Sequence, residues 1–396
     1  MAAAPGEKAR TWPLTRLDVA GAFGDIGVLF PISIALITLN HLNPTAVFLT
    51  AGLTYTLAGW YFRIPMAVQP FKAVAAIALA MALPPTSIAS AGLLMGILLV
   101  FVGATNLATW LARLFSLPIV RGIQLGLGLL LAREGLPLML DRQSSLEMAG
   151  GASVPAWGIA LGGAIVLVLF QGSRRFPAAL VLLAAGVVLG LWAHWGKLPI
   201  LGWGPLPLEL LRPQVNALWR VVPLLVVPQF ALTFGNSIVA TENTARILYG
   251  TQARRVTVRA LSLSIGFVNL ASAMVLASPL CHGSGGVTAH YGFGARTPKS
   301  SCVIGIVCLL LALFGKGAVG LLTLIPTAVL GVFLVYVGIQ HAAYVRDIVK
   351  RVPLLFVAAS VGVVSLATTN LIWGFLVGFI LQGIMFLVAK ARERHV

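Results

Sequence analysis

Residues Val352–Ala389 read VPLLFVAASVGVVSLATTNLIWGFLVGFILQGIMFLVA, a stretch without a charged side chain. One helical crossing of a membrane needs roughly 20 apolar residues, so this stretch is long enough for two crossings. The rest of the chain follows the same pattern, since 59% of its 396 residues are hydrophobic and 9% are charged, whereas soluble domains carry about 25% charged residues. The sequence therefore predicts an all-α polytopic membrane protein surrounded by the lipid bilayer.

The apolar runs and the turn residues between them predict about fourteen transmembrane spans. Their expected starts form two sets of seven: Leu17, Thr45, Pro65, Ile88, Pro118, Ala156 and Pro177, then Leu218, Val256, Gly283, Ser300, Ala318, Pro353 and Leu371. Because seven is odd, the two sets would have opposite orientations, as in the inverted repeats of transporters. The expected division is a first repeat at 17–196, an extracytoplasmic linker at 197–217 and a second repeat at 218–389, flanked by cytoplasmic segments at 1–16 and 390–396.

Basic residues dominate the short loops between the apolar runs. With the N-terminus placed in the cytoplasm, most Lys and Arg residues fall in cytoplasmic segments, which is the positive-inside pattern. That pattern explains the net charge of +17 without a nucleic-acid partner, and it predicts a multi-pass protein of the cell membrane with both termini cytoplasmic. Cys281, Cys302 and Cys308 have no metal-ligand or redox spacing, and no nucleophile–base pattern occurs. We therefore expect no metal, no cofactor and no enzymatic activity.

The third span of each set is interrupted by proline or glycine beside polar residues. The two interruptions read Pro65-Met66-Ala67-Val68-Gln69-Pro70-Phe71-Lys72 and Ser278-Pro279-Leu280-Cys281-His282-Gly283-Ser284-Gly285-Gly286. Interrupted segments at corresponding positions of two halves are the best sequence pointer to a transporter's binding site. A half-helix that begins near Gln69 or Pro70 would direct free N–H groups and its positive dipole end at that site, which favours an anion.

Side chains and backbone at the two breaks are the candidate ligands. Gln69 and Lys72 are three residues apart and would share a helical face. The second break offers a hydroxyl donor and backbone that a ligand can approach closely, at Ser284, Gly283, Gly285 and Gly286. Two half-helix N-termini that meet near the midplane would form a donor-rich site for an oxyanion.

Lys72 is a charge inside an apolar span and needs a partner. A lysine at the centre of a span costs roughly 2.5–3.5 kcal/mol on insertion scales. The functional interpretation makes the substrate anion its partner. The structural alternatives are a resident ion pair with Asp25 or Glu242, or a side chain that extends to the membrane interface.

Asp25 and Glu242 are the acidic candidates for coupling transport to protons. A buried carboxylate beside an anionic substrate favours protonation, which is a physical route to symport. The structural alternatives remain open, because Glu242 lies four residues before Arg246 and Asp25 could cap a neighbouring helix break.

Three neutral polar residues have two interpretations each. His282 stands next to the glycine break, where it either contacts the substrate or is a hydrogen-bonded core residue. Gln229 and Asn236 either contact the cargo or bind backbone groups freed at Pro228. The sequence leaves these alternatives open.

Several of these motifs together resemble the molybdate transporter family, which belongs with the sulfate permeases. The motifs are Gly24-Asp25-Ile26-Gly27, the segment from Pro65 to Lys72, Pro228-Gln229 leading to Thr233 and Asn236, and Cys281-His282-Gly283-Ser284-Gly285-Gly286 leading to His290-Tyr291-Gly292-Phe293-Gly294-Ala295-Arg296-Thr297. The resemblance covers nearly the whole chain.

The resemblance implies a uracil-permease-like fold, with a core domain, a gate domain and a homodimer formed through the gate. It implies a substrate between the third and tenth spans, held by Gln69, Lys72, Asn236, Gly283, Ser284 and His282. It also implies that Glu242 occupies a position linked to proton coupling.

The expected function is secondary-active transport of a tetrahedral oxyanion by alternating access, molybdate before sulfate, with protons as a candidate coupling ion. Alternatives of the same fold are a sulfate or other anion permease, a carrier of a nucleobase or organic anion, and an anion channel. A nucleobase carrier usually needs an acidic residue on the polar edge of the base, whereas Lys72 and two glycine-rich helix starts favour a dianion.

Overall fold

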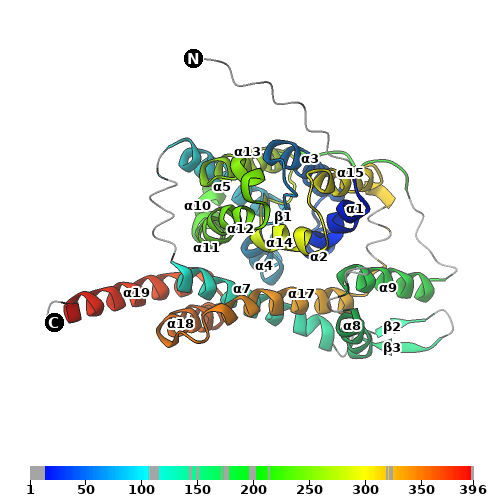
Figure 1. Cartoon of the computed structure of the whole chain (residues 1–396). Helices are drawn as coiled ribbons and strands as arrows, with labels where there is room; N and C mark the ends of the chain where they lie inside the picture. Colours follow the sequence, from blue (N-terminus) through cyan, green and yellow to red (C-terminus); the bar gives the residue numbers. More distant parts are fainter. Residues whose placement is uncertain are drawn as a thin grey trace, which may run out of the picture.

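The computed structural model describes residues 14–105, 107, 116–141, 145–148, 151–170, 173, 178–195, 202–212, 215–317, 320 and 324–393. Its helices pack in two layers (Figure 1). The core layer contains α1 (Arg16–Ala22), η1 (Phe23–Asp25), α2 (Ile26–Leu39), α3 (Pro44–Phe62), α4 (Lys72–Ala80), α5 (Pro85–Ala104), α10 (Val215–Val221), η2 (Val222–Val226), α11 (Val227–Leu232), η3 (Thr233–Val239), α12 (Ala240–Tyr249), η4 (Gly250–Arg255), α13 (Val258–Met274), α14 (Ser284–Gly292) and α15 (Lys299–Leu313). The gate layer contains α7 (Leu117–Leu140), α8 (Ala156–Phe170), α9 (Ala178–Ala193), α17 (Thr327–Ala342), η5 (Ala343–Asp347), α18 (Val352–Thr368) and α19 (Leu371–Glu393).

Small residues bring neighbouring helices close together in the gate layer. A Cβ atom built on Gly128 or Gly135 of α7 would overlap or crowd the backbone of α17 at Gly338 or Gly331. In lipid the hydrophobic effect does not drive helices together, and small residues stabilise their association because they allow close van der Waals packing of the backbones. The pair α7 and α17 therefore forms the centre of this layer, and its inner surface faces the core layer.

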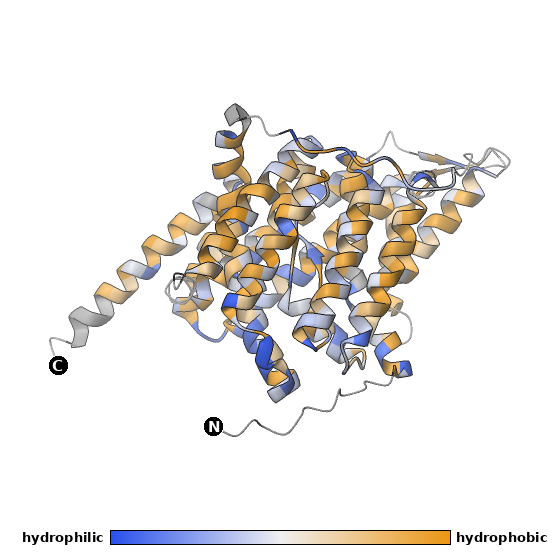
Figure 2. Ribbon diagram, turned by 90° about the horizontal axis from the view of Figure 1, so that it is seen from above, coloured by the Kyte–Doolittle hydropathy of each residue, from blue (hydrophilic) through white to orange (hydrophobic). Residues whose placement is uncertain are grey.

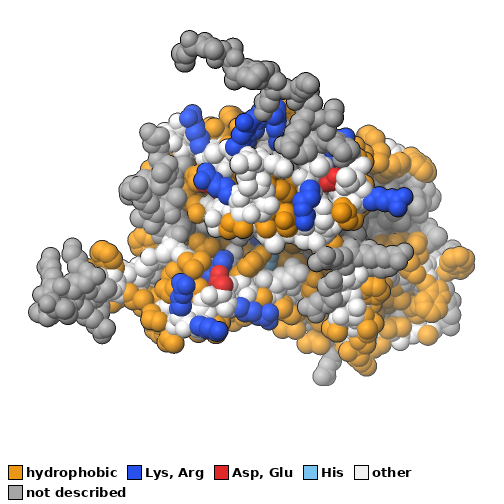
Figure 3. Space-filling model, viewed as in Figure 1, with side chains coloured by type: hydrophobic (Ala, Val, Ile, Leu, Met, Phe, Trp, Pro, Cys, Tyr) orange, Lys and Arg blue, Asp and Glu red, His pale blue; other side chains and the backbone are white. Residues whose placement is uncertain are grey.

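The outer surfaces of the helices suit a bilayer. Four helical segments of the described residues are long and apolar enough to cross a membrane, at Pro85–Ala104, Leu117–Leu140, Leu218–Arg255 and Thr327–Asp347, and the bent pair Arg16–Asp25 and Val28–Leu39 would make a fifth. Shorter apolar helices surround them, with hydrophobic residues along their length and hydrophilic ones gathered near their ends (Figure 2). On the face seen in Figure 1, Lys and Arg outnumber Asp and Glu (Figure 3). The chain is a multi-pass membrane protein, and the number of fourteen spans stays a prediction.

Most helices of the described residues begin within three residues of the start predicted for their span. The third span is different, because residues 65–71 are extended and helix α4 begins only at Lys72, not at Pro65. The expected start at Ala318, residues 1–13 of the N-terminal segment, parts of the 197–217 linker and the last residues of the tail lie outside the described residues. Helix α19 continues to Glu393, into the region expected to be a tail.

Two small antiparallel sheets interrupt the otherwise helical chain. One is a hairpin at the edge of the gate layer, formed by β2 (Ser145–Glu147) and β3 (Ser153–Pro155). The other joins distant parts of the core layer, since β1 (Gln69–Pro70) pairs with β4 (Leu280–Cys281). In its register Gln69 lies opposite Cys281 and Pro70 lies opposite Leu280. The expectation that Gln69 and Lys72 share a helical face is therefore wrong, because Gln69 belongs to a strand that satisfies its backbone across the sheet.

Candidate functional site

The starts of two half-helices, α4 and α14, lie at the sheet formed by β1 and β4. Pro70 cannot donate a backbone hydrogen bond, and the next donor along the chain, Phe71 N–H, bonds to Pro279 O at 2.8 Å. Phe71 and Gly283 are the extended residues that precede helices α4 and α14. Each strand is therefore followed almost directly by a helix. The N-terminal turns of both helices contribute to one cavity of about 520 Å³.

Lys72 lies at the first position of α4 and lines this cavity. Its side chain is 5% exposed, and within the described part of the chain it makes no hydrogen bond and no ion pair within 4 Å. The two proposed ion-pair partners are engaged elsewhere. Asp25 accepts hydrogen bonds from Gln69 Nε2 and, at 2.7 Å, from Tyr55 Oη, and Glu242 pairs with Arg246 at 2.5 Å. The resident ion pair of Lys72 does not form, which leaves the ammonium group facing the cavity.

The free amides at the start of α4 are fewer than the sequence suggests. The N–H groups of Ala73 and Val74 bond to Gln229 Oε1 at 2.9 and 3.2 Å, and Gln229 Nε2 bonds to Thr233 at 2.7 Å. Of the alternatives considered for Gln229, the structure shows the one in which it binds helix backbone. Among the described residues, the amides of Lys72, Ser284 and Gly285 have no hydrogen-bond partner. These amides stand at the positive ends of two helix dipoles.

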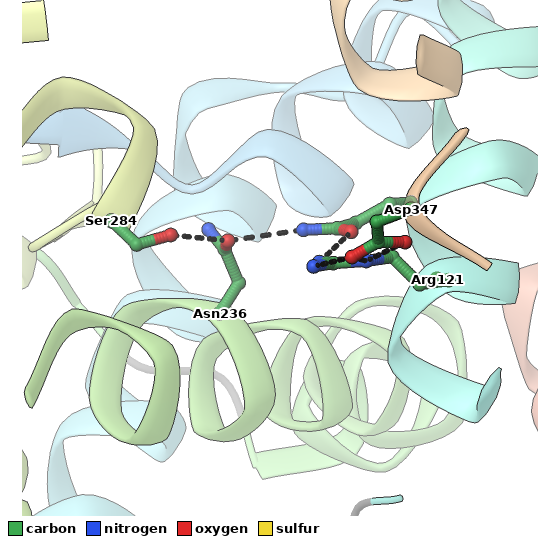
Figure 4. Close-up of polar contacts among 5 residues, drawn as sticks. Arg121, Asn236, Ser284 and Asp347 are labelled. Atoms are coloured by element: carbon green, nitrogen blue, oxygen red, sulfur yellow. Dashed lines mark hydrogen bonds and ion pairs between the residues drawn. The ribbon is translucent and has the colours of Figure 1, made fainter. Parts of the chain in front are cut away.

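Ser284 and Asn236 contact each other at the side of the site. Ser284 Oγ donates to Asn236 Oδ1 at 2.9 Å, and the same oxygen accepts from Gln124 Nε2 at 3.0 Å (Figure 4). A hydroxyl has one proton, so Ser284 has none left for an anion in this arrangement. Neither Ser284 nor Asn236 lines the cavity. Figure 4 shows that the chain of contacts continues to Arg121 and Asp347 of the gate layer.

His282 lies behind the sheet and not on the cavity wall. Its Nδ1 donates to Ala67 O at 2.9 Å, because a carbonyl oxygen only accepts. Its Nε2 therefore accepts from the Ser264 hydroxyl, also at 2.9 Å. Both ring nitrogens are bonded and 1% of its surface is exposed. His282 therefore has the geometry of a hydrogen-bonded core residue, which was one of its two interpretations. Its role as a substrate ligand stays an untested prediction.

Each glycine of the second break allows a particular side chain to approach. A Cβ atom on Gly283 would overlap Gln69 Oε1, one on Gly285 would overlap Tyr344 Oη, and one on Gly286 would overlap an oxygen of Asp25. Gly285 and Gly286 line the cavity, whereas Gly283 does not. The break thus brings α14 into contact with side chains from three other segments.

Sequence reasoning missed the opposite wall of the cavity, which belongs to the gate layer. Tyr336, Gln340 and Tyr344 line it from α17 and η5, together with His341. His341 Nδ1 bonds to Val337 O at 2.9 Å within the helix. The spacing of Tyr336, Gln340 and Tyr344 at i, i+4 and i+8 places them on one helical face. The sequence signal that could have identified this wall is a stripe of polar residues in an otherwise apolar span.

The cavity is therefore a site that favours a small anion. It combines one buried ammonium group, amides at two helix N-termini and the hydroxyl and amide side chains of the gate layer. The acidic residue that lines it, Asp25, has both oxygens engaged by donors. Such an arrangement can bind and orient an anion without covalent chemistry.

Comparisons of the sequence with known proteins identify its relatives. A family model described as "Molybdate transporter of MFS superfamily" matches residues 18–131 and 222–340. "Molybdate transporter 2" of Arabidopsis thaliana is 29% identical over 98% of this chain and 92% of its own length. "Molybdate transporter 1" of Chlamydomonas reinhardtii is 29% identical over 94% of this chain and 92% of its own length.

Solved structures share the fold. The transmembrane domain of the cyanobacterial bicarbonate transporter BicA aligns with a TM-score of 0.67 at 18% identity, over 92% of this chain and 96% of that one. SLC26A9 aligns with a TM-score of 0.68 at 15% identity, over 94% of this chain and 65% of that one. The expected fold class is confirmed. Since the family model matches more than half of the chain, and the relatives align along nearly all of it, this protein belongs to the molybdate transporter family.

Proposed function

We propose that this protein is a secondary-active transporter that carries a tetrahedral oxyanion, molybdate before sulfate, by alternating access. The observation that carries the proposal is the buried ammonium group of Lys72, which faces a cavity at the N-termini of two half-helices and, in the described part of the chain, has no protein partner. A charge kept at membrane depth without a partner costs several kcal/mol. A dianion bound beside it would offset that cost.

The ligands that we propose are Lys72, Gln69 and Gly285, which line the cavity, together with the backbone at Gly283 and Ser284 that directly precedes Gly285. Asn236, which binds the Ser284 hydroxyl at 2.9 Å, would hold this helix start in place. The core layer, which contains both half-helices, would move against the gate layer and expose the cavity to each side in turn.

A nucleobase carrier of the same fold is less compatible with the contacts of Asp25. That carboxylate would have to accept hydrogen bonds from the polar edge of the base, but its two oxygens already accept from Gln69 and Tyr55. A channel with the same cavity would conduct without saturating at low anion concentration, so saturable uptake and counterflow distinguish a carrier from a channel.

The proposal extends to the surroundings of the protein. Both termini would lie in the cytoplasm of a cell-membrane protein, and two copies would associate through their gate layers.

Titration calorimetry of the purified protein tests the proposed cargo. We expect molybdate to bind tightly and a large excess of sulfate to displace it only weakly. Weak molybdate binding that sulfate displaces readily would assign the protein to sulfate. Binding of neither anion, in protein that remains monodisperse, would contradict the proposed function.

A further inference from the structure

His290 of α14 carries a buried ring nitrogen that the oxyanion site does not use. The residue is 0% exposed. Its Nδ1 bonds to Gly21 O at 2.7 Å, and since a carbonyl oxygen only accepts, Nδ1 carries the proton. Nε2 is buried and has no hydrogen-bond partner among the described residues. A lone pair kept in this state costs free energy, and binding one proton would convert it into a charged donor.

A short series of contacts connects His290 with the substrate cavity. The ring of Tyr55 packs at 90° to the His290 ring, with 6.3 Å between the centroids. The Tyr55 hydroxyl donates to Asp25 at 2.7 Å, and Asp25 lies against Gly286, one helical turn before His290 on α14. Asp25 is 1% exposed and lines the cavity together with Lys72. Asp25 therefore lines the cavity and is connected to the His290 ring through Tyr55.

The charges in the site suggest why a proton would bind together with the anion. Lys72 and Asp25 cancel each other, so an entering dianion would leave the site with a net charge of about −2 in a region of low polarizability. A proton taken up at the same time reduces that charge. Negative charge brought next to a titratable group favours its protonated form.

The other titratable or charged groups around Asp25 and His290 are less suited to this role. Cys281, Cys308, Tyr55 and Tyr344 are ordinarily neutral near pH 7, and a lysine such as Lys72 is ordinarily protonated there. His341 lines the far wall of the cavity, on the gate layer. Glu242, the other acidic candidate, is bound to Arg246 and does not line the cavity.

We propose that His290 and Asp25 form the binding site for one proton that is transported with each oxyanion. The proton binds at Nε2 of His290 to give an imidazolium whose charge the carboxylate of Asp25 balances, and it is released when the cavity opens to the other side. No covalent bond of the anion changes. The inference rests on the proposed oxyanion transport and assigns its coupling site.

Proton uptake can be measured directly during anion binding. Molybdate is titrated into the purified full-length protein in buffers of different ionisation enthalpy, at the same pH, and the dependence of the heat on the buffer gives the number of protons taken up. We expect about one proton for each anion, and an affinity that rises about tenfold for each unit by which the pH falls. In His290→Gln, whose amide can still donate to Gly21 O, we expect molybdate to bind with neither proton uptake nor this pH dependence.

Matched variants keep the inference testable. Asp25→Asn, which is neutral and nearly isosteric, should lose proton uptake in the same way if His290→Gln does not fold. Glu242→Gln should keep it. Uptake that persists in His290→Gln and Asp25→Asn, or that disappears in Glu242→Gln or His341→Gln instead, would overturn the assignment. A wild-type protein that binds the anion without taking up a proton would overturn the inference alone, whereas one that binds no anion would contradict the proposed function itself.

Discussion

Lys72 combines a structural cost with a binding role. The residue is 5% exposed at the start of α4, and its ammonium group has no partner among the described residues. Lys72→Ala should therefore raise the thermal unfolding temperature of the anion-free protein, because it removes an unpaired buried cation. The same change should weaken molybdate binding by about 1.5–3 kcal/mol, roughly 10- to 150-fold.

Thermal unfolding tests the expected rise in unfolding temperature, and calorimetry of the same preparation tests the expected loss of molybdate affinity. Lys72→Arg is the control, since it keeps the charge and should retain more of the affinity than Lys72→Ala. An unchanged affinity in Lys72→Ala would remove this residue from the binding site.

The side-chain hydroxyl of Ser284 already donates a hydrogen bond within the protein. Its hydroxyl proton goes to Asn236 Oδ1, so the backbone amide of Ser284 and not its side chain is available to the anion. We expect Ser284→Ala to lower stability by about 1 kcal/mol, the contribution of one hydrogen bond, and to change molybdate affinity by less than about threefold. A loss of affinity as large as that of Lys72→Ala would instead make the hydroxyl a direct ligand.

At the scale of elements, α14 and the 3-10 helix η5 approach each other beside the cavity. A Cβ on Gly285 would overlap the Tyr344 hydroxyl, which belongs to the other layer. Gly285→Ala should therefore slow uptake of labelled molybdate into proteoliposomes, and adding Tyr344→Phe should restore part of the rate, because the overlapping oxygen is gone. If the double variant is no faster than Gly285→Ala, the contact between these two residues is not what limits uptake.

The two half-helices also show what the sequence could and could not predict. Proline and glycine at the breaks are local signals, and they located the helix start at Ser284 within one residue of the expected Gly283. The extended path before Lys72 could not be found in the same way. It depends on pairing between Gln69 and Cys281, which are far apart along the chain, and no local pattern encodes such a partner.

The sequence predicted those site residues whose side-chain chemistry indicates a role without knowledge of their neighbours. The charge of Lys72 in an apolar span indicated an anion, and the structure leaves that charge facing the cavity. Gln229 was less informative, because an amide side chain fits a ligand as well as a helix end, and only the tertiary contact with Ala73 and Val74 decides. Tyr336 and Gln340 were missed because each is common in ordinary helices.

At the scale of the whole molecule, polar contacts tie the core layer to the gate layer. Arg121 binds Asp347 at 2.5 Å and Gln124 at 2.9 Å, and Gln124 binds Asn236 of the core layer. The side chains of Arg121 and Asp347 are 18% and 45% exposed, and an ion pair of that kind contributes about 0–1 kcal/mol. Because this ion pair lies within the gate layer and reaches the core layer only through the bond from Gln124 to Asn236, Asp347→Asn should shift the balance between conformations of the two layers by no more than about fivefold.

Electron–electron distance measurements between spin labels on α13 and α18 would detect that shift. High salt should act in the same direction, since it screens the exposed pair. Arg246→Gln is the matched control, because it breaks the ion pair with Glu242 inside the core layer and should leave the distances between layers unchanged. Equal shifts in both variants would mean that the contacts of Arg121 do not hold the layers together.

The sheet formed by β1 and β4 also has a consequence for how the protein is made. Its strands come from opposite halves of the chain, so more than half of the polypeptide is synthesised after the first strand and before its partner. Until then the backbone of Gln69 and Phe71 lacks the hydrogen bonds that the sheet supplies, in a place where water cannot supply them. The backbone of this segment can therefore complete its hydrogen bonds only after Leu280 and Cys281 have been synthesised.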